Sequence, residues 1–189
     1  GNRVRIIGWD DLLNEEHYQG FPADFFSVPG DVVATLDGQD LTGEFRTFIH
    51  GPFKYGSEED VGDRNATSLA LQVVLGDNPS AGGVLLFGDH KYPIIRKIFD
   101  ITNSHDNKEN LLWQVLLAPH HCSKSVMYQD EDGKEVLKQD LLDDLSAHEV
   151  GEGYVVASAN SIPTSNEDGD NPPHAKAKAR YQEIGRAQV

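Results

Sequence analysis

The chain has 189 residues, of which 38% are hydrophobic and 25% are charged. That length and composition are typical of a single globular domain with a core large enough to support itself. No apolar run approaches the roughly 18 residues that a membrane-spanning helix requires, so we expect no membrane partner. The formal net charge of −15 repels phosphate backbones and argues against a broad nucleic-acid-binding surface.

The cysteine content and the first residue bear on the origin of the chain. The single cysteine, Cys122, excludes an internal disulfide, which fits a reducing compartment and favours a cytoplasmic protein. The chain begins with Gly1 rather than Met, and no signal-peptide pattern follows it. We therefore expect the chain to be part of a longer protein.

The first 50 residues predict only short elements. Two strands are expected at Asp31–Leu36 and Glu44–His50, joined by a turn at Asp37–Gly38. The segment before them predicts a strand at Val4–Ile7, one or two helical turns at Asp10–His17 and a loop at Gly20–Pro29.

The rest of the chain alternates apolar strands with amphipathic helices. Apolar runs predict strands at Thr67–Leu75, Gly83–Phe87, Leu111–Leu117 and Tyr154–Ser158. Helices are predicted at Tyr92–Ile101, Val136–Leu145 and Ala175–Ile184, and loops at Gly51–Asp63 and Ile162–Pro173. Two acidic segments, Asp130–Gly133 and Asn166–Asp170, lack the spacing of calcium-binding loops and predict solvated turns. The alternation predicts a layered α/β or α+β domain.

Polar side chains follow three of the predicted strands, at the point where each strand ends. Asp89 follows the second apolar strand, His120 and His121 follow the third, and Asn160 follows the fourth, with His174 farther along. If these strands run side by side in one direction, their ends place the Asp and the histidines along one rim of the sheet.

A carboxylate and imidazoles at one rim suit a divalent metal, with zinc first and manganese or iron as alternatives. Such a metal lowers the pKa of its bound water and supplies hydroxide for hydrolysis. By residue type alone, one Asp and a His-His pair are not a ligand set. Asp89 also suits a turn or helix cap, the His pair a surface turn, and His174 the first turn of the last helix.

Four segments taken together are more specific than any one of them. They are Asn65-Ala66-Thr67-Ser68-Leu69, the strand ending in Gly88-Asp89, Pro119-His120-His121-Cys122-Ser123, and the strand leading into Ser158. Their order resembles the metallo-β-lactamase-fold hydrolases related to the hydrolase domain of bacterial DNA-uptake channel proteins. The resemblance covers residues 44–184, whereas residues 1–43 match poorly.

The resemblance implies the C-terminal half of an αββα metallo-β-lactamase-like sandwich for residues 44–189. It implies that Asp89 is the metal-bridging and catalytic aspartate. The His120-His121 pair matches the later ligand turn, with His121 as a catalytic candidate, although either ring suits the metal. His174 matches the family's late histidine more loosely.

Two departures from the family change what is expected of this chain. Cys122 stands where the family has Gly, so we expect a different backbone conformation, because Cys disfavours positive φ. The family's N-terminal His-x-His-x-Asp-His cluster is absent from the 189 residues. We therefore expect weak metal binding at most and no turnover from the chain alone.

The resemblance implies the C-terminal part of a metal-dependent hydrolase acting on a phosphodiester or another small phosphorylated substrate. Half a sandwich leaves one sheet face uncovered, so we expect the missing N-terminal half or a dimer partner to cover it. Two alternatives stay open: a non-catalytic interaction or regulatory module of the same fold, and an unrelated α/β binding domain.

Overall fold

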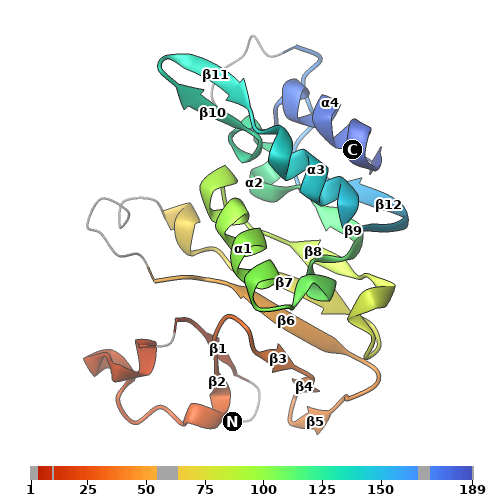
Figure 1. The fold of residues 1–189 in the computed structure, drawn as a ribbon. Helices are drawn as coiled ribbons and strands as arrows, with labels where there is room; N and C mark the ends of the chain where they lie inside the picture. The colour runs from red at the N-terminus through yellow and green to blue at the C-terminus, as the bar shows by residue number, and fades with distance from the viewer. Residues whose placement is uncertain (1–3, 10, 55–63, 166–170, 189) are drawn as a thin grey trace.

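A seven-stranded mixed sheet forms the centre of the molecule (Figure 1). The computed structural model describes residues 4–9, 11–54, 64–165 and 171–188. The strand order is β13-β12-β9-β8-β7-β6-β3. The strands are β3 (Val32–Val33), β6 (Arg46–Gly51), β7 (Ala70–Val74), β8 (Val84–Leu86), β9 (Trp113–Leu117), β12 (Glu149–Val156) and β13 (Arg186–Gln188).

The sheet has an antiparallel half and a parallel half. β3, β6, β7 and β8 pair antiparallel, whereas β8, β9, β12 and β13 pair parallel. The register aligns Leu85 with Leu116, and Leu116 with Val155. The second, third and fourth apolar strands therefore do run side by side in one direction, the condition on which the predicted rim depends.

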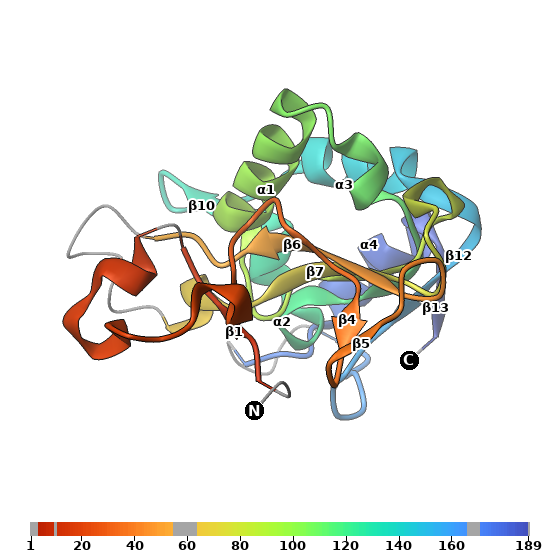
Figure 2. The same ribbon diagram turned by 90° about the horizontal axis from the view of Figure 1, so that it is seen from below.

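Helices connect the parallel strands. They are α1 (Tyr92–Ser104), α3 (Gln139–Ala147) and α4 (Ala175–Ile184), and a one-turn helix, α2 (Pro119–Cys122), follows β9. All three longer helices contribute side chains to one core cluster, among them Phe99, Leu142 and Tyr181. Figure 2 shows α1 and α3 on the same side of the sheet. No helix among the described residues is long and apolar enough to cross a membrane. The predicted mixed α/β class is confirmed.

The two faces of the sheet differ in burial. Leu85, Leu116 and Val155 form a continuous buried row under the helices. Their neighbours along the strands, such as Leu86 and Leu117, point to the opposite face and are half-buried. A sheet face that is open to water normally carries polar side chains. The second face of this sheet carries apolar side chains, which is unusual for a face that no other element covers.

The prediction of a helix at Val136–Leu145 was wrong at its start. Residues up to Leu137 belong to β11 (Lys134–Leu137), which pairs antiparallel with β10 (Tyr128–Glu131). Asp132 and Gly133 make the two-residue turn between them, with φ of 55° and 75°. Asp-Gly is a strong hairpin signal, and here it outweighs the helical spacing of the leucines that follow.

The turn at Asp37–Gly38 was assigned to the wrong pair of strands. It joins two short strands, β4 (Thr35–Leu36) and β5 (Gln39–Asp40), with φ of 52° and 76° at its centre. The strands predicted at 31–36 and 44–50 do pair with each other, as β3 with β6. The predicted loop at 20–29 contains β2 (Phe26–Ser27), which pairs parallel with β1 (Ile6–Ile7). The helical turns expected at 10–17 are two 3₁₀ helices, Leu12–Asn14 and Glu16–Tyr18.

Two of the predicted polar segments fall partly outside the described residues. They are positions 55–63 of the loop predicted at 51–63 and positions 166–170, which form the second acidic segment within the loop predicted at 162–173.

His50 fixes the antiparallel half of the sheet to the helical layer. Its ring is buried between β6 and α1, with Nδ1 3.1 Å from Thr102 Oγ1 and Nε2 2.9 Å from the Asn110 carbonyl oxygen. The carbonyl accepts from Nε2–H, and in the neutral ring Nδ1 accepts from the Thr102 hydroxyl. Burial lowers the pKa of His50 to about 4.

We predict a stability loss on acidification that depends on His50. The unfolded state takes up the proton near pH 6.5 and the folded state only near pH 4, so stability falls as pH drops through this window. Urea unfolding of wild type should therefore lose about 3 kcal/mol more between pH 7 and pH 4 than a His50→Asn variant does. His105→Asn, at an exposed position, is the matched control and should behave like wild type. Equal losses in wild type and His50→Asn would contradict the assignment.

Candidate functional site

The candidate site lies where three neighbouring parallel strands end. Asp89 comes three residues after β8, the His120-His121 pair follows β9, and Ser158 follows β12. Because β8, β9 and β12 are parallel neighbours, their carboxyl ends meet at one edge of the sheet. Open α/β sheets commonly bind ligands at this edge.

Asp89 and His121 face each other at this edge. His121 Nε2 lies 3.4 Å from Asp89 Oδ1, and His121 Nδ1 lies 2.7 Å from the carbonyl oxygen of Ser158. The side chains of Asp89 and His121 are 39% and 52% exposed, so solvent and solutes reach both. The pair is therefore accessible while its imidazole is oriented by the main chain.

The hydrogen bond to Ser158 fixes the tautomer of the neutral His121 ring. A carbonyl oxygen only accepts, so Nδ1 carries the hydrogen, and a neutral ring turns the Nε2 lone pair toward Asp89. Two lone pairs facing each other repel, so the arrangement is stable with a proton on Nε2 or with a cation shared by both atoms. Two donors each about 2.1 Å from a tetrahedral ion lie about 3.4 Å apart, the separation observed here. Asp89 and His121 therefore fit as two donors to one metal ion.

His120 points to other partners. Its Nε2 lies 3.3 Å from the Asn65 side-chain amide nitrogen, which donates to it, and its Nδ1 lies 3.2 Å from Ser125 Oγ. In the neutral ring both nitrogens are thus engaged in hydrogen bonds within the protein. Of the two adjacent histidines, the one whose ring meets Asp89 is His121.

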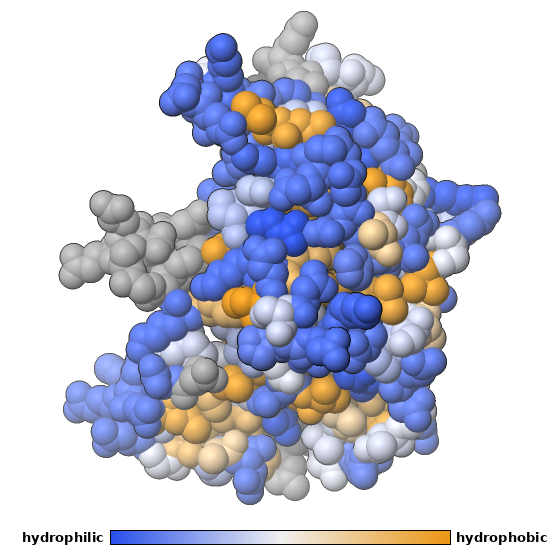
Figure 3. Space-filling model, viewed as in Figure 1, coloured by the Kyte–Doolittle hydropathy of each residue, from blue (hydrophilic) through white to orange (hydrophobic). Residues whose placement is uncertain are grey.

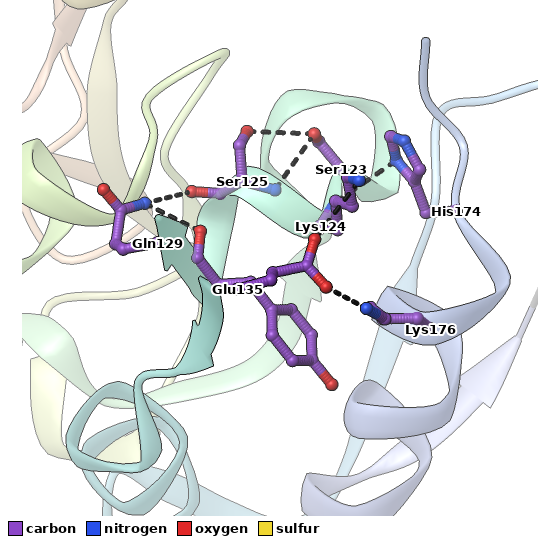
Figure 4. A network of polar contacts seen from close by, with 8 residues as sticks. Ser123, Lys124, Ser125, Gln129, Glu135, His174 and Lys176 are labelled. Carbon is purple, nitrogen blue, oxygen red and sulfur yellow. Dashed lines mark hydrogen bonds and ion pairs between the residues drawn. The ribbon is translucent and has the colours of Figure 1, made fainter. Parts of the chain in front are cut away.

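His174 is buried on the other side of the same turn. Its exposed fraction is 5%, its Nδ1 accepts a hydrogen bond from the Lys124 amide, and its own amide donates to the Cys122 carbonyl. Figure 4 shows the ring of His174 beside Ser123 and Lys124 at the start of α4. These bonds join the start of α4 to the turn that carries His121. His174 therefore helps to position His121.

The turn after β9 has an uncommon backbone. His120, His121 and Cys122 have φ of 50°, 54° and 64°, in the left-handed region. The expectation that Cys122 avoids positive φ was wrong. Such a conformation costs about 1–2 kcal/mol per non-glycine residue and persists only where the surrounding structure enforces it. Here the turn is fixed by the bond from the His120 amide to the Gly88 carbonyl (2.8 Å) and by His174.

Gly88 allows the Asp89 turn to approach a segment from another part of the chain. Its φ is 55°, and a Cβ there would lie 2.7 Å from Ser68 Cβ and 2.9 Å from the Leu69 carbonyl oxygen. Without that Cβ, the Asp89 amide donates to Ser68 Oγ at 3.1 Å. Ser68 thus orients Asp89 while Asn65 orients His120. The sequence motif contained both residues, but their spacing gave no sign of these partners.

An open cleft of about 460 Å³ lies beside His121. Ser158, Ala159, Asn160 and the two prolines Pro172 and Pro173 complete its lining. Asn160, which was noted only as a strand-end residue, therefore borders the space next to the Asp89–His121 pair.

A polar network on the far side of the turn braces it against the β10–β11 hairpin (Figure 4). Glu135 pairs with Lys176 and, at 3.2 Å, with Lys124, and these cations lower its pKa. The Gln129 amide donates to the Ser125 carbonyl oxygen at 3.1 Å. The described residues contain no group of three or more His, Cys, Asp or Glu that could hold a metal ion. Of the four predicted metal ligands, the structure thus brings Asp89 and His121 together.

We predict that the Cys122 thiol is unreactive in the native protein. The side chain is 1% exposed, and burial raises its pKa to about 11, so almost no thiolate is present at pH 8. A disulfide reagent such as DTNB should label about one thiol per chain in 6 M guanidinium and almost none in buffer. Cys122→Ser supplies the blank. Rapid stoichiometric labelling of the native chain would contradict the buried placement.

No family model, curated protein sequence or solved structure matches the chain.

Proposed function

We propose that the chain is the C-terminal part of a metal-dependent hydrolase, with Asp89 and His121 as two of its metal donors. The observation that carries the proposal is the 3.4 Å approach of His121 Nε2 to Asp89 Oδ1 at an accessible sheet edge. The hydrogen bond from His121 to the Ser158 carbonyl supports it, because metal-binding histidines normally donate their other N–H to a carbonyl or carboxylate.

A divalent ion at this position, zinc first and manganese or iron as alternatives, would supply an activated water for hydrolysis. The Asp89 amide donates to the Ser68 hydroxyl, and His121 Nδ1 donates to the Ser158 carbonyl oxygen. These two hydrogen bonds orient Asp89 and His121 for such an ion. His120 and His174 shape the turn. The remaining donors would come from sequence beyond these 189 residues. A phosphodiester or another small phosphorylated substrate is the class that the resemblance implies.

The apolar second face of the sheet supports the proposed sandwich. Residues such as Leu86 and Leu117 keep part of their surface exposed there, and at the edge of the face Val156 is 38% exposed. Parallel strands rarely leave an apolar face open to water. An N-terminal half-sandwich or a second copy of the chain would cover it.

The second candidate function is a non-catalytic interaction module of the same fold. It is favoured by the same apolar face, which suits a protein partner. It is also favoured because Asp89 and His121 supply two donors, and no third His, Cys, Asp or Glu among the described residues joins them as a possible metal ligand. The two candidates differ in whether this pair binds metal at all.

We predict that the chain binds Zn²⁺ weakly and that Asp89→Asn and His121→Ala each weaken this binding at least tenfold. Each variant removes one of two converging donors. Isothermal titration with Zn²⁺, followed by Mn²⁺, measures the effect. His105→Ala, an exposed histidine outside the site, is the matched control and should bind like wild type.

The same variants decide between the two functions. Zn²⁺ affinity that survives both substitutions would refute the metal proposal and leave the interaction module. Loss in His120→Ala but not in His121→Ala would instead reverse the assignment of the two rings. We expect no hydrolysis of bis(p-nitrophenyl) phosphate by the chain alone.

A further inference from the structure

A second cavity lies in the N-terminal layer, among elements that do not contribute to the candidate site. Its volume is about 290 Å³. Its lining combines apolar side chains with one guanidinium and consists of Val4, Arg5, Phe25, Thr35, Leu36, Asp37 and Gly38. These residues come from the start of the chain, from the 3₁₀ helix before β2 and from the β4–β5 hairpin.

The apolar walls of this cavity are open to solvent. Val4 is 62% exposed and Leu36 is 48% exposed, and Val32 on the nearby β3 is 50% exposed. Figure 3 shows apolar side chains gathered over the lower part of the molecule, where the N-terminal elements lie. Burying such surface is favourable by about 25 cal/mol per Å², so a ligand with an apolar body gains from covering it.

Arg5 gives the cavity its positive charge. Its Nη1 donates to Ser27 Oγ at 2.8 Å and its Nη2 to Thr35 Oγ1 at 3.5 Å. Both partners are uncharged hydroxyls, and none of the ion pairs found among the described residues involves Arg5. Acidic residues outnumber basic ones by 31 to 16 in this chain, so a guanidinium with only hydroxyl partners stands out. The Arg5 guanidinium retains further N–H donors, and their planar arrangement matches the two oxygens of a carboxylate.

The wall opposite the N-terminal strand is preformed. Asp37 and Gly38 make a two-residue turn with positive φ at both positions, the geometry that suits a tight hairpin. The Leu41 amide also donates to the Ala34 carbonyl at 2.8 Å and closes the base of the hairpin. The Asp37 carboxylate lies in the lining as well, but it already has an interaction of its own. Within the described lining, a ligand therefore meets a fixed apolar wall and the Arg5 guanidinium.

We propose that this cavity binds a small monocarboxylic acid with an apolar body. The carboxylate pairs with Arg5, and the body covers Val4, Phe25 and Leu36. The volume is at the lower end of the range for small-molecule sites, which limits the ligand to a short chain or a single ring.

Octanoate, octanamide and acetate are the probes that test the proposal, with binding to the whole chain measured by isothermal titration and NMR shift changes. Octanoate should bind, whereas octanamide lacks the charge and acetate lacks the body, and each should bind at least tenfold more weakly. Arg5→Gln should weaken octanoate binding at least tenfold. Arg186→Gln, a surface arginine paired with Glu152, is the matched control and should leave it unchanged.

Leu36→Ser provides a second variant that keeps both hydrogen bonds of Arg5, in case Arg5→Gln loosens the N-terminal layer. It should also weaken octanoate binding. Equal binding of octanoate and octanamide, or an unchanged affinity in Arg5→Gln, would overturn the proposal. A peptide with a free C-terminal leucine is a further probe. If it binds more tightly than octanoate and loses this binding when its C-terminus is amidated, the proposed chemistry is supported and the natural carboxylate is that of a polypeptide C-terminus.

Discussion

The parallel pairing of β8, β9, β12 and β13 is the constraint on which most of the structure depends. Parallel neighbours need a crossover connection, and here α1, α3 and α4 lie between the successive strands. The strand order advances in one direction through all three crossovers. Right-handed connections that advance in one direction place their helices on the same face. The single core cluster shared by the three helices agrees with this, and it explains why the second face of the sheet has an apolar, partly exposed surface.

The same constraint brings the candidate site together. Each crossover begins at the carboxyl end of a strand, so the residues that start the connections meet at one edge. The left-handed conformation of His120, His121 and Cys122 then turns His121 toward Asp89. The cost of that conformation is offset by hydrogen bonds from segments that are distant in the sequence. Gly88 accepts from the turn, and His174 donates to it.

Two solvent-accessible regions of the molecule have functional groups that suit a ligand, and the two suit ligands of opposite charge. The Asp89–His121 pair is a polar group at the edge of the parallel half of the sheet and suits a cation. The cavity around Arg5 belongs to the N-terminal layer and suits an anion with an apolar body. Because the two share no residue, the function proposed for one does not depend on the other.

Local pattern determined much of the fold. The helical spacing of Ile94, Ile95, Ile98 and Ile101 was sufficient to predict α1, and the apolar run before Gly88 was sufficient to predict β8. Such patterns report burial of one face, which is a property of consecutive residues. Turns were predicted at both Asp37–Gly38 and Asp132–Gly133, but the short strands that each turn joins were not, because strand pairing depends on which segments meet as well as on the turn.

For the site, the sequence by itself determined which residues stand at strand ends: Asp89, His120, His121 and Asn160. Only the tertiary structure decided which of them meet. His120 and His121 are adjacent and chemically identical, yet one ring is directed to Asn65 and Ser125 and the other to Asp89. The two residues have nearly the same left-handed φ, 50° and 54°, so the difference arises from partners that are distant in the sequence: Asn65, 55 residues from His120, and Asp89, 32 residues from His121. Contacts of that range are set by how the strands pack, which residue type and spacing do not encode.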